Sequence, residues 1–359
     1  MSTGRRATGG RPGGKDSEPG SAGAPATELR MVDAIRAAMH DELAADPSVV
    51  LFGEDVTVGG PFGATNGLQD AFGTERVRDT PISEGAVMGM AVGAAATGLR
   101  PIVEIMFMDF ATLALDQLVN HAAKLRYMSG GQLSIPLTVR VQAGASGAFG
   151  AHHSQSLEAW FAHVPGLKVV AASTPRDAYG LLRAAIRDPD PVVFIEHRAL
   201  YWGKGPVAVG EAGIAPIGRA ALRRPGRDVT LIAWSRMAAT ALAAAEQLAA
   251  EGIEAEVLDL RSLQPLDLET VLASVRRTRR AVIAHEAVMT GGLGGELVAS
   301  IQAAAFDRLV APIGRVGAPF APVPASPALE AAFVPGPAAI VDAVRYTMAG
   351  SIASREEAG

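Results

Sequence analysis

Segments typical of buried strands alternate with segments typical of helices along most of this chain. In the first half, short apolar runs at 49–52, 101–107, 137–141, 167–173 and 191–197 are separated by stretches with helical spacing. Strands that alternate with helices form a parallel sheet whose two faces are covered by the helices. The alternation therefore predicts an α/β protein built on a parallel sheet.

The alternation stops and starts again, which predicts two domains. Residues 203–218 are rich in Gly, Pro and short polar side chains, and a second series of strands and helices follows them. The first 27 residues are rich in Gly, Ser, Pro and charge without apolar periodicity, so we expect them to be disordered, with a helix starting near Glu28. The predicted division is a tail at 1–27, a domain at 28–202, a linker at 203–218, a domain at 219–348 and a tail at 349–359.

Composition excludes several classes of protein. The formal net charge of −5 over 359 residues argues against nonspecific binding to nucleic acid or to anionic membranes. The chain has no cysteine, which excludes disulfides, thiolate metal sites and a cysteine nucleophile. No apolar run reaches the roughly 18–20 residues that span a bilayer. We therefore expect a cytoplasmic protein that binds neither nucleic acid nor membrane.

One stretch, DTPISEGAVMGMAVG, combines a single carboxylate with a glycine-rich helix. Glu84 stands at the start of the helical segment, and Gly85, Gly89 and Gly93 follow at intervals of four residues. Residues four apart share a helical face, and a face without side chains lets another backbone or a flat ligand come close. An apolar strand and Phe110 come next. We interpret this stretch as a way to present one proton-handling group to a planar heterocycle.

The local sequence leaves plainer explanations open. Glu84 is also what a helix dipole favours in a first turn, with Ser83 as the N-cap, and a glycine face usually serves helix packing. His152 and His153 follow a glycine-rich loop, where an imidazole can act as a general acid or base, or simply lie on the surface. No phosphate-binding glycine motif, nucleophile elbow or zinc spacing is present.

Several sequence blocks, in order, resemble one enzyme family. They are GEDV, DTPISEG, GLRPIVEIMFMDF, LDQLVNHAAKLRYMSGG, GAHHSQSLEAWFAHVPGLKVV, LDLRSLQPLD and HEA followed by GGLGGEL. Together they resemble the β subunit of thiamin-diphosphate-dependent 2-oxo acid dehydrogenases, a family that includes pyruvate, branched-chain 2-oxo acid and acetoin enzymes. The resemblance runs from about Leu29 to the C-terminus. It implies a pyrimidine-binding, transketolase-like domain followed by a transketolase C-terminal-like domain.

The resemblance also implies partners and cofactors. In the family, an α2β2 heterotetramer holds thiamin diphosphate between the two kinds of subunit, and the α subunit supplies the Mg²⁺ and diphosphate motif. This chain lacks such a motif, in agreement with its missing phosphate-binding loop. A dihydrolipoyl acyltransferase core, with its lipoyl domain, is the further partner.

Three site residues follow from the resemblance. The family glutamate that bonds N1′ of the aminopyrimidine matches Glu84, and the aromatic residue stacked beside that ring matches Phe110. The histidine that faces the substrate or the lipoyl group matches His153, whereas His152 has no assured counterpart. A potassium site described for relatives would use Leu137, Thr138, Ala185, Asp188 and Asp190, largely through backbone carbonyl oxygens; the last of these residues is often Asn in the family.

The implied function is oxidative decarboxylation of a 2-oxo acid, pyruvate or a branched-chain acid, with reductive acylation of lipoamide. An acetoin dehydrogenase β subunit is the alternative, because a methyl difference in an apolar pocket discriminates by only about 1–3 kcal/mol and leaves little trace in a sequence. A non-catalytic paralogue kept for assembly is the second alternative. We expect little activity from this chain without an α subunit.

Overall fold

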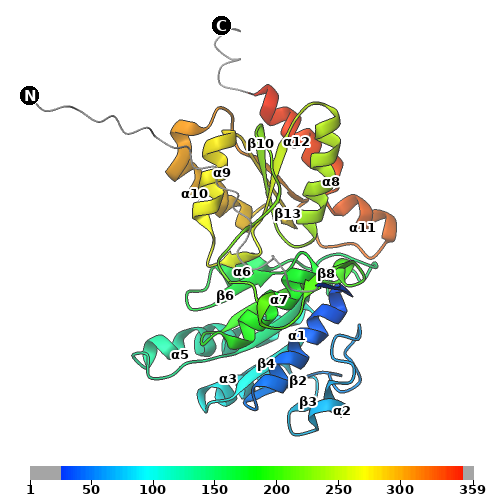
Figure 1. The fold of residues 1–359 in the computed structure, drawn as a ribbon, viewed down its shortest axis with the longest axis vertical. Helices are drawn as coiled ribbons and strands as arrows, with labels where there is room; N and C mark the ends of the chain where they lie inside the picture. Colours follow the sequence, from blue (N-terminus) through cyan, green and yellow to red (C-terminus); the bar gives the residue numbers. More distant parts are fainter. Residues whose placement is uncertain (1–25, 351–359) are drawn as a thin grey trace, which may run out of the picture.

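The computed structural model describes residues 26–350, which form two α/β units stacked along the long axis of the molecule (Figure 1). Disorder is predicted for residues 1–27; of these, 1–25 lie outside the described part of the chain, as do 351–359. Ala26 and Thr27 lie in a strand, so the prediction is wrong for these two residues. The α/β class predicted from the alternation of segments is confirmed.

The first unit is built on a seven-stranded sheet in the order β12-β6-β7-β5-β4-β2-β3. Its strands are β2 (Val49–Gly53), β3 (Val77–Asp79), β4 (Arg100–Ile105), β5 (Thr138–Ala143), β6 (Lys168–Ala171), β7 (Val192–His197) and β12 (Ser262–Gln264). All neighbouring pairs are parallel except β12 with β6. Most residues of β4, β5 and β7 are buried, as expected for strands covered on both faces.

Helices cover both faces of this sheet. On one face, α1 (Met31–Ala45) and α7 (Pro175–Arg187) pack around a core that includes Ile35, Leu181 and Phe194. The short helix α2 (Leu68–Phe72) contributes Leu68 to the same core. On the other face, α3 (Glu84–Ala96) and the helices that follow β4 pack over the sheet.

The helix predicted at 113–127 is more irregular than its sequence indicated. A 3₁₀ turn, η1 (Met108–Phe110), leads into α4 (Ala111–Leu115), a π-helical segment η2 (Asp116–Ala122) and α5 (Ala123–Met128). The glycine face of α3 packs against this helix: a Cβ at Gly85 would lie 3.2 Å from the Leu113 carbonyl oxygen, and one at Gly89 would lie 3.3 Å from Gln117 Oε1. Close helix packing therefore accounts for these two glycines.

The second unit has a five-stranded sheet in the order β14-β13-β10-β11-β9. Its strands are β9 (Ala221–Arg224), β10 (Val229–Ala233), β11 (Ala255–Asp259), β13 (Ala281–Val288) and β14 (Gly314–Ala318). Helices α8 (Arg236–Ala250) and α12 (Pro337–Ala349) contribute to the core on one face, while α9 (Leu268–Thr278) and α10 (Leu293–Ala305) contribute to the core on the other. The remaining helix, α11 (Pro327–Phe333), lies close to the first unit (Figure 1).

The two units share one hydrophobic core. Val139 and Phe161 of the first unit belong to the same buried cluster as Ile232 and Leu297 of the second. Strand β12, which follows β11 of the second sheet, pairs with β6 of the first sheet. The apolar interface between the two units is thus continuous with the hydrophobic core of each unit. This close packing holds the two sheets in one relative position.

The start of the fold differs from the predicted helix at Glu28. Residues Ala26–Arg30 form strand β1, which pairs antiparallel with β8 (Lys204–Ala208), and α1 begins only at Met31. The segment predicted as a linker therefore contains a strand, and the 3₁₀ turn η4 (Glu211–Gly213) follows it. Strands β1 and β8 are far apart in the sequence, so no local sequence pattern predicts that they pair. The domain bounds 28–202 and 219–348 stay a prediction.

One segment, Pro327–Ala349, is long and apolar enough to pass as a membrane span by length and composition alone. It consists of two helices, α11 and α12, separated at Val334–Gly336. Ile340, Val341 and Val344 of α12 are buried in the core of the second unit. We therefore assign α12 as a core helix of this fold.

Candidate active site at the carboxyl edge of the first sheet

The loops that follow the parallel strands meet at one edge of the first sheet. Glu54 follows β2, Phe110 lies in the turn after β4, His153 lies in the loop after β5, and Arg198 follows β7 directly. These four strands are neighbours in the sheet, so their carboxyl ends converge. The carboxyl edge is where open α/β sheets bind ligands.

Glu84 is a buried carboxylate at the beginning of α3. Its exposed fraction is 6%, and it is the first helical residue, where the helix dipole favours a negative charge. Ser83 occupies the N-cap position without a side-chain cap hydrogen bond. Within residues 26–350, the Glu84 carboxylate has no hydrogen-bond or ion-pair partner. It therefore keeps its full capacity to accept a hydrogen bond.

A second carboxylate, Glu54, lies close enough to Glu84 to interact with it. Burial raises the pKa of Glu54, and the negative charge of Glu84 raises it further. The site thus contains a second acidic group, Glu54, that the sequence analysis had not selected.

Phe110 and His153 are in contact. Their ring centroids are 5.2 Å apart at an interplanar angle of 77°, and Phe107 meets the same imidazole at 4.7 Å. The loop is held in place by Gln155, whose side-chain amide donates to Asp109 Oδ1 at 2.8 Å. The contact of Gly85 with the Leu113 carbonyl places the start of α3 against the helix that Phe110 begins. His152, by contrast, is exposed.

The arrangement suits a planar, nitrogen-containing ring. An unpartnered buried carboxylate can bond a ring nitrogen, and aromatic rings nearby provide flat, apolar surface for the rest of the ring. His153 adds an imidazole, whose ring nitrogens can donate or accept a hydrogen bond. Chemically, the site fits the aminopyrimidine of thiamin diphosphate, although no residue here forms a phosphate-binding loop.

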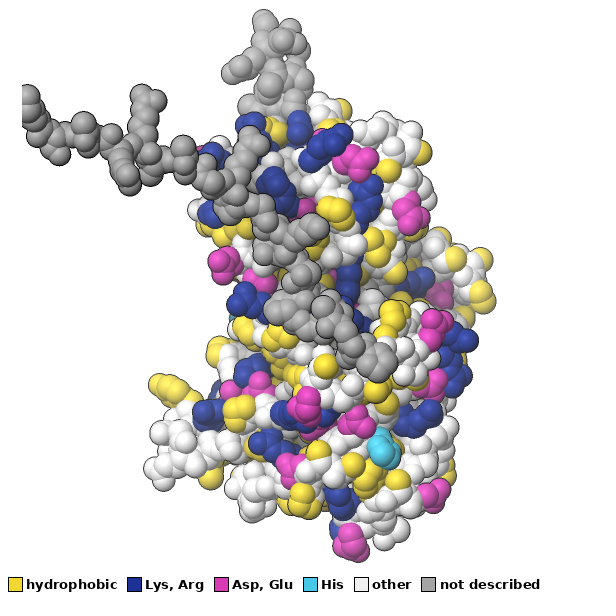
Figure 2. Space-filling view, viewed as in Figure 1, with side chains coloured by type: hydrophobic (Ala, Val, Ile, Leu, Met, Phe, Trp, Pro, Cys, Tyr) yellow, Lys and Arg dark blue, Asp and Glu magenta, His cyan; other side chains and the backbone are white. Residues whose placement is uncertain are grey.

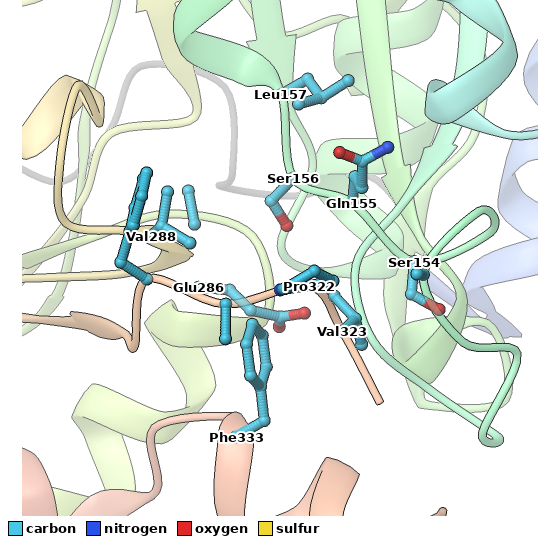
Figure 3. A pocket seen from close by; sticks show the side chains of 13 residues that line it. Ser154, Gln155, Ser156, Leu157, Glu286, Val288, Pro322, Val323 and Phe333 are labelled. Atoms are coloured by element: carbon cyan, nitrogen blue, oxygen red, sulfur yellow. The ribbon is translucent and has the colours of Figure 1, made fainter. Parts of the chain in front are cut away.

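A cavity of about 390 Å³ lies between the two units, next to this site (Figure 3). Ser154–Leu157 line it from the loop after β5, and Glu286, Val323 and Phe333 line it from the second unit. Glu286 Oε2 lies 2.9 Å from His197 Nε2, and Glu286 Oε1 accepts a hydrogen bond from the Ala145 N–H at 2.6 Å. These contacts lower the pKa of Glu286 against the opposing effect of burial.

Comparisons with known proteins give the family. Residues 27–203 match the family model described as "Transketolase, pyrimidine binding domain", and residues 218–340 match "Transketolase, C-terminal domain". The chain is 47% identical over 87% of its length to pyruvate dehydrogenase E1 component subunit beta-2 of Oryza sativa subsp. japonica, covering 84% of that protein. It is 46% identical over 90% of its length to the acetoin:2,6-dichlorophenolindophenol oxidoreductase subunit beta of Cupriavidus necator, covering 99% of that protein.

This chain belongs to the E1 β-subunit family of pyruvate dehydrogenases and acetoin oxidoreductases. A solved structure described as a split gene transketolase, inactive beta4 tetramer, has a similar fold, with a TM-score of 0.74 and 25% identity over 92% of this chain and all of that one. The family and fold predicted by resemblance are therefore confirmed.

Three of the residues predicted to bind potassium, Leu137, Asp188 and Asp190, have contacts within the protein. Lys168 Nζ contacts both oxygens of the Asp188 carboxylate, at 2.7 and 2.8 Å, and Asp190 Oδ2 at 3.3 Å. The Leu137 carbonyl accepts a hydrogen bond from the Val192 N–H, at the amino end of the sheet and away from Glu84. A potassium ion at the two aspartates would compete with the Lys168 ammonium group. The site stays a prediction, as do the roles of Thr138 and Ala185.

The E1 β-subunit site also contains residues that the sequence analysis missed. Arg198 directly follows strand β7, and Glu286 lies inside strand β13, two residues before its end. Charged residues at such positions are usually exposed, and nothing in the local sequence indicates that these two are buried. Glu54 belongs to the block GEDV, but nothing in its local sequence indicates that it lies near Glu84. Within the described residues, no group of three or more His, Cys, Asp or Glu side chains is arranged to hold a metal ion.

Proposed function

We propose that this chain is the β subunit of the decarboxylating component of a 2-oxo acid dehydrogenase complex, acting on pyruvate or a branched-chain 2-oxo acid. The observation that carries the proposal is the buried, unpartnered Glu84 at the start of α3, beside the turn that presents Phe110 to His153. The similarity to pyruvate dehydrogenase β subunits supports it.

In this proposal each residue has a separate task. Glu84 holds a proton at N1′ of the aminopyrimidine, and the Phe110 ring packs beside that heterocycle. When bound, thiamin diphosphate supplies the carbanion and electron-sink chemistry of decarboxylation. His153 moves a proton at its imidazole during acyl transfer to a lipoyl group. The packed loops around these side chains keep water away from them.

An α subunit completes the site in an α2β2 heterotetramer and supplies the Mg²⁺ and diphosphate contacts. Exposed apolar side chains on α3, α4 and α5 support burial against another subunit: Met90, Leu113, Tyr127 and Met128. The similar solved chain is described as an inactive beta4 tetramer, which is consistent with low activity of this half without its partner. A dihydrolipoyl acyltransferase would be the next partner in the complex.

On the face in Figure 2, acidic and basic side chains are interspersed over the first unit. We retain the proposal that the protein works in the cytoplasm without binding nucleic acid or membrane. The acetoin reaction remains the second candidate, because an acetoin oxidoreductase β subunit is as similar as the pyruvate dehydrogenases are. An assembly role without catalysis is the third candidate.

A substrate panel tests the proposed function. The chain is co-purified with its α subunit, loaded with thiamin diphosphate and Mg²⁺, and assayed with pyruvate, branched-chain 2-oxo acids and acetoin. We expect the highest kcat/KM with a 2-oxo acid. Turnover of acetoin alone would select the second candidate, and cofactor binding without any turnover would select the third.

His153→Ala is expected to slow acyl transfer to lipoamide by about 100-fold, because a positioned general acid or base contributes about 10²–10⁴ to such a step. Decarboxylation measured with an artificial electron acceptor should fall much less. The exposed neighbour gives a matched control, His152→Ala, which should leave both assays within about twofold of wild type. Equal losses in the two assays would assign His153 to an earlier step.

A further inference from the structure

Arg198 stands apart from the other buried arginines of the described chain. Four arginines are less than 9% exposed, and three of them are neutralised by carboxylates: Arg140 by Glu104 and Glu196, Arg183 by Glu42, and Arg261 by Asp177. Arg198 is 4% exposed and has no carboxylate within ion-pair distance among residues 26–350.

The guanidinium group of Arg198 keeps two nitrogen atoms without a partner. Nη2 donates to the Gly144 carbonyl oxygen at 2.8 Å and lies 3.4 Å from Ser154 Oγ, but Nε and Nη1 are buried without a hydrogen-bond acceptor. A buried donor or charge without a partner costs several kcal/mol, so each such group in a native protein needs a cause, such as an ordered water, an ion, a ligand or another chain.

Aromatic rings supply the remaining contacts of this cation. The Arg198 guanidinium carbon lies 5.1 Å from the Phe107 ring centroid and 4.9 Å from that of Phe149. Cation–π contacts of this kind offset only part of the desolvation of a charge. Burial accordingly lowers the pKa of Arg198, but an arginine remains protonated at neutral pH. Asp109, Glu286 and Glu330 attract this cation only from beyond ion-pair distance, so within the described chain it has no direct counter-ion.

The position of this charge links it to the candidate active site. The Phe107 ring that contacts Arg198 also contacts the His153 imidazole, so one aromatic side chain joins the cation to the imidazole. Ser154, whose hydroxyl approaches Nη2, lines the cavity between the two units. Phe149 is 46% exposed and is the contact that can move toward solvent.

We propose that Arg198 is the anion-recognition residue of this chain, and that one of its two free donors, Nε or Nη1, receives the carboxylate of a small 2-oxo acid once Phe149 turns aside. A hydrogen bond from a guanidinium N–H to a carboxylate is charge-assisted, and therefore stronger than one between neutral groups. The inference rests on the proposed function and deepens it, because an unpaired cation beside the site selects an anionic 2-oxo acid over neutral acetoin.

The test measures binding without turnover, in the complex with the α subunit. Oxamate, an unreactive carboxylate shaped like pyruvate, is titrated by calorimetry into wild type, Arg198→Met and Arg198→Lys. We expect Arg198→Met to weaken oxamate binding by about 10- to 100-fold, as for loss of a charged hydrogen-bonded pair, and Arg198→Lys to recover only part of it. Unchanged oxamate affinity in Arg198→Met would overturn the proposal.

Stability and two further ligands separate this role from others. Removing an unpaired buried charge should leave the apparent Tm of Arg198→Met unchanged or higher. The matched control Arg183→Met removes one of the two arginines that pair with the buried Glu42, so it should lower the Tm while keeping oxamate affinity. A drop in Tm for Arg198→Met equal to that of the control would indicate a structural ion pair with an α-subunit carboxylate. Tighter Arg198-dependent binding of inorganic phosphate than of oxamate would assign the site to a phosphate group instead.

Turnover by wild type distinguishes failure of this inference from failure of the proposed function. If the complex decarboxylates pyruvate but Arg198→Met raises neither its KM nor its oxamate dissociation constant, the function holds and the inference fails. If wild type binds oxamate through Arg198 but turns over no 2-oxo acid, the anion site holds and the function fails. We expect instead a KM for pyruvate raised by about 10-fold or more, with kcat changed less.

Discussion

Glu84→Gln is expected to lower the rate of 2-oxo acid decarboxylation by at least about 100-fold in the complex with the α subunit. This factor is the lower end of the rate enhancement that a positioned general acid or base contributes. An amide has nearly the shape of the carboxyl group but cannot take up and return a proton. The change should not disturb the fold, because the Glu84 carboxylate has no partner within residues 26–350 to lose. Steady-state kinetics with pyruvate and with branched-chain acids measure the effect.

A second buried glutamate provides the control for this experiment. Glu158 is 5% exposed, and its Oε1 accepts a hydrogen bond from Trp234 Nε1 at 3.2 Å, away from the ring contacts of Phe110. Burial raises the pKa of Glu158, so the neutral amide of Glu158→Gln should be well tolerated. We expect this variant to keep activity within a few-fold of wild type. Near-normal turnover of Glu84→Gln would remove the proposed role of Glu84.

The sequence predicted those parts of the fold that local periodicity encodes. The strand at 191–197 and the helix at 175–187 are found as expected, since apolar runs and a Thr-Pro start are local signals, and Thr174 indeed accepts a hydrogen bond from the Asp177 N–H. Pairings between distant segments were missed. Strand β1 pairs with β8, and β12 joins the sheet of the other unit, through backbone hydrogen bonds that require no particular side chain.

The residues of the candidate site also fall into two groups: those that the local sequence predicted and those that depend on contacts between distant segments. Glu84, Phe110 and His153 were selected because they stand in recognisable blocks, and the structure places Phe110 against His153. Arg198 could not be selected, because burial without a counter-charge depends on Phe107 and Phe149, which come from two other loops. The π-helical segment after α4 was also invisible, since its apolar spacing differs little from that of an α-helix.

The largest expected effect on stability comes from Arg140, at the centre of the first sheet. Its Nη1 donates to Glu104 Oε2 at 2.7 Å, and its Nε and Nη2 donate to the two oxygens of Glu196 at 2.7 and 3.0 Å. Tyr201 donates its hydroxyl to Glu196 at 2.6 Å. Arg140→Met is expected to cost about 3–5 kcal/mol, because it leaves two buried carboxylates without their counter-charge. Thermal unfolding of the complex at a fixed scan rate measures the loss.

An exposed arginine and a compensated triple variant give the matched comparisons. Arg78→Met removes an ion pair with Glu75 in which both side chains are largely exposed, so its Tm should stay within about 1–2 °C of wild type. Replacing Arg140, Glu104 and Glu196 together by Met, Gln and Gln should recover part of the loss, because no buried charge is then left. A triple variant no more stable than Arg140→Met would show that packing of the arginine stem, not charge, dominates.

The pH dependence of Arg140→Met follows from the same electrostatics. Burial already raises the pKa of Glu104 in the wild-type protein, while Arg140 opposes that shift. Without the arginine, the folded-state pKa of Glu104 rises further above its unfolded value, so the folded variant binds more protons than the unfolded one. Its stability should therefore increase as the pH falls from about 8 toward 5, and the gap to wild type should narrow. A gap that is constant over this range would mean that the two carboxylates find other donors once Arg140 is removed.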